Sequence, residues 1–146
     1  MRDEKRVARL TVQLREAMGS PYGATVASPS DAWELLRDME PLLQEQLRVL
    51  VLNTRNKVLD VATVYQGSVN TAVVRMAEIF RPAILCNAPA VILAHNHPSG
   101  DPEPSEADIA MSKLVGEAGK LLEVQVLDHI IIGLNCWVSL KARGHL

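Results

Sequence analysis

The chain has 146 residues, a length typical of one domain, and 48% of them are hydrophobic while only 3% are aromatic. This hydrophobic content excludes a disordered protein and predicts a core built from aliphatic side chains and Met. The formal net charge of −2 excludes a uniformly basic nucleic-acid-binding protein, without excluding a local basic patch.

Cysteine content and hydropathy indicate the compartment. Cys86 and Cys136 are too few for a disulfide framework and form no CxxC pair, which favours a reducing environment. No apolar run reaches the ~20 residues that a membrane span needs, and residues 1–6 are not followed by the apolar segment of a signal peptide. We therefore expect a cytoplasmic protein that does not associate with membranes.

Residues 1–27 are expected to form an amphipathic helix followed by a linker. Val7, Leu10 and Leu14 recur at helical spacing, and Gly19 ends the pattern. Because this apolar stripe needs a surface to cover it, the helix is a candidate for the contact of a homodimer.

Residues 28–146 are expected to form one α/β domain with a central sheet and helices packed on it. Ser28, Pro29 and Asp31 provide the N-cap, first-turn proline and capping box of a helix. The apolar run from Ala90 to Ala94 is typical of a strand covered on both faces. The other expected elements are, in chain order, a helical stretch at 42–46, strands at 47–53 and 58–65 joined by a turn, helices at 73–85 and 105–122, and strands at 124–132 and 137–140.

Side chains that suit Zn²⁺ gather around the end of the expected strand at 90–94. His95 and His97 lie two residues apart, so their imidazoles share one face and can converge on one ion. Asp108, in the first turn of the following helix, can complete a His/His/Asp set. Such a set leaves the fourth tetrahedral position to water, which is typical of a catalytic rather than a structural zinc site.

Each of these residues also has an ordinary structural explanation. Two histidines at a strand end are more often exposed or hydrogen-bonded than bound to a metal. Ser105 and Asp108 form an S-x-x-D capping box, and capping is the commoner role of such a pair. The two roles are compatible, because a serine at a helix N-terminus presents its hydroxyl where developing negative charge is favoured.

The pattern His95-x-His97, seven residues, Ser105-x-x-Asp108 resembles the JAMM motif of the JAB/MPN+ metalloprotease superfamily. The sequence from His95 to Ser105, together with the later segment Leu127–Gly133, resembles its RadC-like branch, and the similarity covers most of the chain. The resemblance implies a cytidine-deaminase-like, three-layer α/β/α JAB/MPN domain with a mixed central sheet. It also implies Zn²⁺ bound by His95, His97 and Asp108, with Ser105 helping to stabilise an oxyanion and an upstream glutamate acting as general base.

The resemblance places this base near a junction between a helix and a strand. Glu45 fits, because it ends the expected helical stretch and precedes the strand at 47–53, where RadC-like chains also tend to have a glutamate. The alternative for Glu45 is a solvated side chain at the end of an element. Glu78 is the second candidate for the base, but it lies three residues from both Arg75 and Arg81, and a surface ion pair accounts for it.

Two neighbouring polar residues on the expected strand at 124–132 are candidates for supporting the site. Asp128 and His129 alternate on that strand, so one of them faces inward. Histidines that bind a metal usually donate their other N–H to a carboxylate or a carbonyl, which makes Asp128 a candidate partner. The alternative is a buried polar residue bonded to the backbone.

These observations predict a JAMM-type zinc hydrolase in which metal-activated water attacks a peptide or isopeptide bond of a protein substrate. A DNA repair-associated protein, either a metal-dependent nuclease or a recruited accessory, is one alternative. It requires the basic residues to form a groove, and those available are Arg48, Arg55, Lys57, Arg75 and Arg81. Residues 1–27 are too few for the helix–hairpin–helix module of full-length RadC-like proteins. A metal-stabilised interaction module without turnover is the other alternative.

Overall fold

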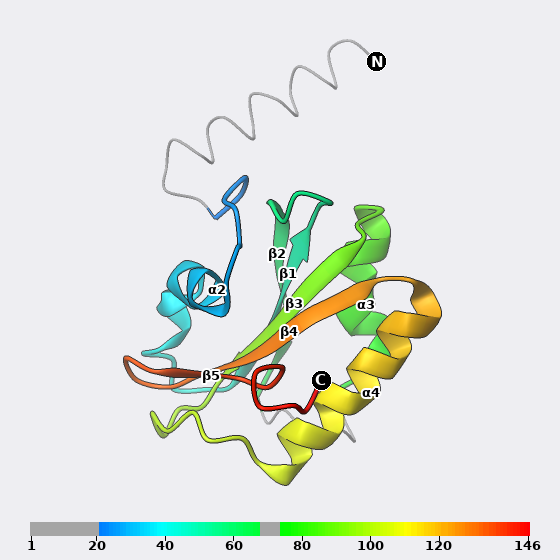
Figure 1. Ribbon diagram of the computed structural model, residues 1–146. Coiled ribbons are helices and arrows are strands. Elements are labelled where there is room, and N and C mark those ends of the chain that lie inside the picture. Colours follow the sequence, from blue (N-terminus) through cyan, green and yellow to red (C-terminus); the bar gives the residue numbers. More distant parts are fainter. Residues whose placement is uncertain (1–20, 68–73) are drawn as a thin grey trace.

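The computed structural model describes residues 21–67 and 74–146 (Figure 1). The helix predicted near the N-terminus lies outside these ranges, and its role in a homodimer stays a prediction. Within the described ranges, no helix combines the length and the apolar character needed to cross a membrane. The described elements are α2 (Pro29–Leu35), the 3-10 helix η1 (Arg37–Met39), β1 (Gln46–Leu52), β2 (Val58–Gln66), α3 (Met76–Leu85), β3 (Ala90–Asn96), α4 (Glu106–Leu122), β4 (Gln125–Ile132) and β5 (Trp137–Ser139).

The five described strands form one sheet in the order β2-β1-β3-β4-β5. β1 is antiparallel to both β2 and β3, and β4 is antiparallel to β5, whereas β3 and β4 are parallel. Parallel neighbours need a long crossover connection, and here α4 provides it. The predicted α/β class with a mixed central sheet is confirmed.

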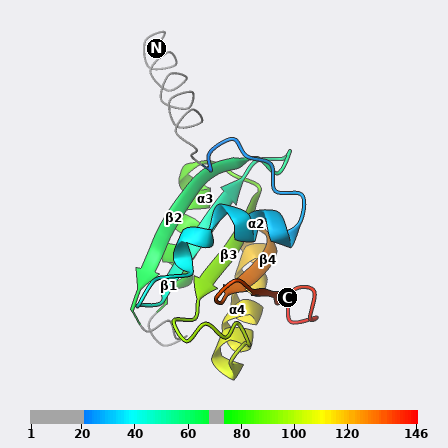
Figure 2. The ribbon, with the colours of Figure 1, turned by 90° about the vertical axis from the view of Figure 1, so that its left-hand side faces the viewer.

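Helices cover both faces of the sheet, which gives the predicted three layers. α2 lies on one face, and α3 and α4 lie on the other (Figures 1 and 2). β3 is buried along its whole length between these layers, which explains its continuous apolar sequence. The core on the α3–α4 side includes Val49, Phe80, Leu93, Met111 and Val115. The core on the α2 side includes Leu36, Met39, Leu50, Ile92 and Ile130.

The start of α2 agrees with the sequence pattern. The Asp31 backbone N–H donates to Ser28 Oγ at 3.4 Å, and Asp31 Oδ2 accepts from the Ser28 backbone N–H at 3.0 Å. These reciprocal bonds satisfy two backbone donors that a helix N-terminus otherwise leaves unpaired. The predicted capping box is confirmed.

The predicted helical stretch at 42–46 is wrong. This segment is an irregular connection between η1 and β1, and β1 begins at Gln46. The Glu45 carbonyl accepts from the Gly67 backbone N–H at 2.9 Å, while the Gln44 carbonyl and the Gln46 N–H bond to the Asn96 side chain. One helical turn is marginal by itself, so these tertiary hydrogen bonds determine the conformation.

The packing of α4 on β4 can be tested at a glycine. A Cβ at Gly119 would lie 2.6 Å from the Val124 carbonyl oxygen and 2.7 Å from Val126 Cγ2. Gly119→Ala is therefore expected to lower the free energy of unfolding, because overpacking costs about 1–3 kcal/mol and outweighs the ~1 kcal/mol that Ala gains over Gly in a helix. Urea unfolding measures the difference.

Gly116→Ala, on the same helix, is the matched control. A Cβ there would meet Leu146 Cδ1 at 3.3 Å, the end of a flexible side chain that can move aside. This variant is expected to be as stable as the parent or more so. A Gly119→Ala protein as stable as Gly116→Ala would contradict the close packing of α4.

Candidate metal centre

The parallel pair β3–β4 and its crossover helix bring the candidate ligands to one edge of the sheet. His95 continues the alternation of Val91 and Leu93 and therefore faces α4. His97 directly follows β3, and its backbone N–H donates to the Ile132 carbonyl at 2.9 Å. Since α4 runs back along the sheet to start β4, its first turn, with Asp108, begins at this same edge (Figure 1).

The loop between β3 and α4 is held in place by the turn that follows β4. The Gly100 N–H donates to the His97 carbonyl at 2.9 Å, and the Gly100 carbonyl accepts from the Leu134 N–H at 2.9 Å. At Gly133 a Cβ would overlap the Gly100 carbonyl oxygen and lie 2.8 Å from Pro102 Cδ. The glycine of the Leu127–Gly133 segment thus permits close contact with the loop that carries His97.

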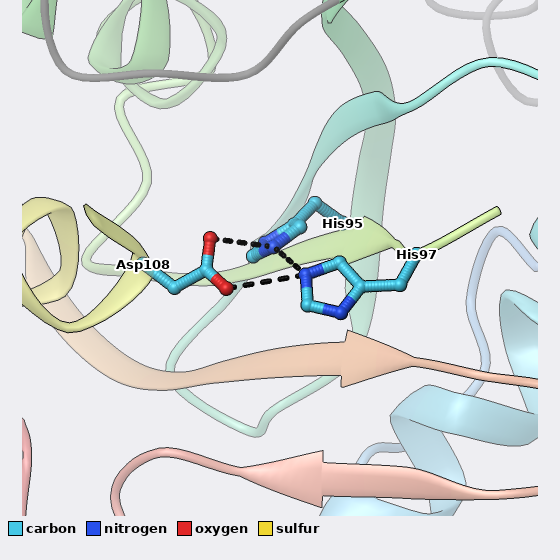
Figure 3. Close-up of side chains that lie close together, drawn as sticks. All are labelled: His95, His97 and Asp108. Atoms are coloured by element: carbon cyan, nitrogen blue, oxygen red, sulfur yellow. Dashed lines mark hydrogen bonds and ion pairs between the residues drawn. The ribbon is translucent and has the colours of Figure 1, made fainter. Parts of the chain in front are cut away.

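The side chains of His95, His97 and Asp108 converge (Figure 3). The two Nε2 atoms are 3.1 Å apart, Asp108 Oδ1 is 3.1 Å from His95 Nε2, and Asp108 Oδ2 is 3.1 Å from His97 Nε2. Zinc–ligand bonds of about 2.0–2.1 Å put neighbouring atoms of a tetrahedral site about 3.3–3.4 Å apart. The cluster therefore has nearly the spacing of three zinc ligands.

The hydrogen bonds around the cluster show which atoms turn lone pairs inward. His97 Nδ1 lies 2.9 Å from the Asp101 carbonyl oxygen, which can only accept. His97 Nδ1 therefore carries the hydrogen, and in the neutral ring Nε2 presents a lone pair to Asp108 and His95. Electron-pair donors that face one another at 3.1 Å need a proton or a metal cation between them. The donor set fits a divalent metal.

In the chain without a metal, the neighbours of His97 and Asp108 determine how readily each of them is protonated. The hydrogen bond to Asp108 raises the pKa of His97 against the opposing effect of burial, and the Asp101 carbonyl and the charges of Asp108 and Glu45 add to the rise. Burial acts to raise the pKa of Asp108, but the hydrogen bonds of the two histidines, the charge of His95 and the Ser105 N–H hold it well below its usual range. The centre thus keeps a buried carboxylate ionised.

Ser105 is the N-cap of α4, and its predicted capping box is confirmed. The Asp108 N–H donates to Ser105 Oγ at 3.1 Å, and Asp108 Oδ2 accepts from the Ser105 N–H at 2.8 Å. The cap therefore orients the Asp108 carboxylate. Ser105 is exposed at this edge and accepts in the cap bond, so its hydroxyl hydrogen can serve another acceptor. Its role toward an oxyanion stays a prediction.

Glu45 directly precedes β1, where Leu47 pairs with His95 across the ladder. Its side chain is half-buried, and its charge contributes to the raised pKa of His97. Glu78, in the first turn of α3, lies 4.0 Å from the guanidinium of Arg75, which is the ion pair expected from their spacing. The arrangement favours Glu45 over Glu78 as the base, although that role stays a prediction.

Asn96, which the sequence analysis did not single out, holds the segment that carries Glu45. Its Oδ1 accepts from the Gln46 N–H at 2.8 Å, and its Nδ2 donates to the Gln44 carbonyl at 3.1 Å. The residue between the two histidines thus bonds the backbone on both sides of Glu45. Its position between the two histidines could have indicated such a role, because a buried Asn at the end of an apolar strand needs polar partners.

Of the two explanations left open for Asp128, the structure favours the buried residue bonded to the backbone and not the partner of a metal ligand. Register places Asp128 beside Ile92, on the α2 side of the sheet, where its carboxylate accepts from Ser139 Oγ at 2.6 Å and from the His129 backbone N–H at 2.7 Å. His129 instead pairs with Leu93 and faces the centre.

His129 contacts the candidate ligand His95. Its Nε2 lies 2.7 Å from His95 Nδ1, and its Nδ1 lies 2.5 Å from Ser112 Oγ. Complete burial, helped by the charge of His95, lowers the pKa of His129 well below its usual value. His129 is therefore a neutral imidazole in contact with the centre.

Comparison with known proteins extends over most of the chain. The family model of the RadC-like JAB domain matches residues 26–145. A UPF0758 protein of Roseiflexus castenholzii is 48% identical over 120 residues, which is 82% of this chain and 52% of that protein. A UPF0758 protein of Chloroflexus aurantiacus is 44% identical over 140 residues, 96% of this chain and 58% of that protein. The chain spans about half the length of the curated relatives it matches.

The convergence of ligand atoms predicts stoichiometric metal binding. The purified protein is expected to bind one Zn²⁺, and His97→Ala is expected to weaken binding by more than the roughly 10–100-fold that loss of an outer partner costs, because a direct ligand is removed. Elemental analysis after dialysis and calorimetric titration measure this. His145→Ala, a histidine outside the cluster, is the control and should bind normally. Zinc content unchanged in His95→Ala, His97→Ala and Asp108→Ala would contradict the site.

Proposed function

This chain belongs to the RadC-like JAB domain family, and we propose that it is a JAMM-type, zinc-dependent hydrolase that cleaves a peptide or isopeptide amide bond. The observation that carries the proposal is the convergence of His95, His97 and Asp108. Three protein ligands leave a fourth position for the reacting groups, as in catalytic zinc sites.

The donor chemistry supports Zn²⁺ as the ion. Two imidazoles and one carboxylate are donors of intermediate softness, which suit zinc better than the hard cations Ca²⁺ or Mg²⁺. When bound, zinc supplies Lewis-acid polarisation of a carbonyl and activation of water near neutral pH. The His97 side chain is 15% exposed and Ser105 is exposed, so substrate can approach the cluster from this side.

Glu45 is the general base in this proposal. It takes a proton from the attacking water and passes it to the departing amine, a role that requires a carboxylate near the ligands that is not itself one of them. Three observations support the assignment: Glu45 directly precedes β1, the Asn96 side chain bonds the backbone on both sides of it, and its charge raises the pKa of His97.

Ser105 is the oxyanion donor in this proposal. Its hydroxyl stands at the N-terminus of α4, beside Asp108, where the helix dipole also favours negative charge. A donor placed where charge develops lowers the barrier more than one that binds substrate and transition state equally.

Glu45→Gln is expected to keep stoichiometric zinc and to lose turnover by about 10²–10⁴-fold, because the amide cannot accept the proton. Cleavage of a peptide and isopeptide library, followed by mass spectrometry, gives the rate, and elemental analysis gives the zinc content. Glu78→Gln is the matched control and should retain both. Wild-type turnover in Glu45→Gln would refute this choice of base, and loss confined to Glu78→Gln would select the alternative.

The two capping serines separate a catalytic from a structural role. Ser105→Ala and Ser28→Ala each remove a capping-box hydroxyl and are expected to cost about 1 kcal/mol of stability. Only Ser105→Ala is expected to lower turnover as well, by about 10²–10³-fold, since it alone removes an oxyanion donor. Thermal unfolding and the cleavage assay give the two quantities. Equal rates in both variants would leave Ser105 as a cap and nothing more.

A direct role on DNA is not proposed. Of the basic residues available for a groove, Arg48 is paired with Asp38 at 2.8 Å and Arg75 lies 4.0 Å from Glu78. Salt-dependent binding to DNA would favour the repair-associated alternative. Zinc binding without cleavage of any peptide in the library would favour the interaction module.

A further inference from the structure

A buried row of three side chains leads from the candidate metal centre into the domain. Ser112 Oγ lies next to His129 Nδ1, and His129 Nε2 lies 2.7 Å from His95 Nδ1. All three residues are fully buried. From the centre outward, the row consists of His95 on β3, His129 on β4 and Ser112 on α4, one helical turn after Asp108.

The position of the hydrogen on His95 decides whether this residue can bind a metal. Its Nε2 faces Asp108 and His97, so that atom must present a lone pair to an ion held among the three. A neutral imidazole has one hydrogen, which then resides on Nδ1. That buried N–H needs an acceptor, and His129 Nε2 is in hydrogen-bond reach.

The hydrogen on His95 Nδ1 determines where the hydrogens of His129 and Ser112 lie. If His129 Nε2 accepts, its own hydrogen resides on Nδ1 and is donated to Ser112 Oγ. The reverse arrangement, with every donor and acceptor exchanged, would put a hydrogen on His95 Nε2 and aim it at Asp108. A serine hydroxyl rotates and can serve either arrangement, so only one of two proton patterns is compatible with a bound metal.

We propose that His129 is a positioning residue for the metal centre. It accepts the Nδ1 hydrogen of His95 and thereby fixes the tautomer and ring orientation that direct His95 Nε2 to the ion, while Ser112 Oγ accepts the Nδ1 hydrogen of His129. The inference rests on the metal centre of the proposed function. Histidine ligands usually have a carboxylate or carbonyl in this role, and a neutral imidazole differs from a carboxylate because it adds no negative charge beside Asp108.

Substitutions that keep or remove the acceptor test this role. His129→Leu removes it and is expected to weaken Zn²⁺ binding about 10–100-fold, the usual effect of losing an outer partner of a ligand. His129→Gln offers an amide oxygen near the position of Nε2 and is expected to restore most of the affinity. Competition with a chromophoric chelator measures the dissociation constants. Ser112→Ala should shift affinity in the same direction as His129→Leu.

Asp128→Asn is the matched control, because Asp128 is the buried polar neighbour of His129 on the opposite face of β4. It is expected to leave zinc affinity unchanged. Zinc affinity in His129→Leu equal to that of the parent would overturn the proposal, as would a loss in His129→Leu that His129→Gln does not reverse.

A measurement on the unaltered chain covers the case in which His129→Leu does not fold. In the zinc-loaded protein labelled with ¹⁵N in the imidazole rings, NMR is expected to show His95 and His129 both as the Nδ1–H tautomer. An Nε2–H or doubly protonated His129 would overturn the inference.

Failure of the inference is distinguishable from failure of the proposed function. A chain that binds zinc with the expected tautomers but cleaves nothing would refute the hydrolase and uphold the role of His129. A hydrolase whose zinc affinity is indifferent to His129 would do the opposite. A parent chain that binds no zinc would overturn both.

Discussion

The parallel pairing of β3 with β4 is the constraint on which the candidate centre depends. Because parallel strands require a crossover, α4 must begin at the edge where β3 ends, and this brings Asp108 to His95 and His97 although the intervening loop has no regular structure. The same pairing aligns Leu93 with His129 and so places an imidazole behind His95. Ligands commonly bind at the carboxyl ends of strands in α/β sheets, and the candidate centre lies at such an end.

Burial gives these polar groups their chemical character. His95, Asp108, Ser112 and His129 lie in the apolar interior between the sheet and α4, where an unpaired polar group is costly. Within the described part of the chain, no buried side-chain nitrogen or oxygen lacks a hydrogen-bond partner. A fully satisfied network of this kind is rigid, so the three candidate ligand atoms are held at a spacing that suits a metal ion.

Local sequence patterns predicted much of this arrangement. The capping box of Ser105 and Asp108, the continuous apolar run of β3 and the two-residue spacing of the histidines are short-range features, and each has the structure that its local physics favours. The errors were all long-range. The segment before Glu45 is not helical because Asn96, some 50 residues away, takes its backbone hydrogen bonds. Asp128 was named as the candidate partner because a carboxylate is a usual acceptor for a histidine that binds a metal. Alternation along the strand shows that Asp128 and His129 face opposite ways, but it does not show which of them faces the centre.

The order of residues was thus sufficient for most of the element types, the family resemblance and the three candidate ligands, since these follow from spacing within a helix turn, a strand or a short motif. Packing of the sheet was needed to choose between neighbours and to bring distant segments together. It selected His129 over Asp128 through the register of β4 on β3, and it attached the Glu45 segment to Asn96. The physical reason is that register and tertiary hydrogen bonds minimise the free energy of the whole core, a quantity that no local window of sequence contains.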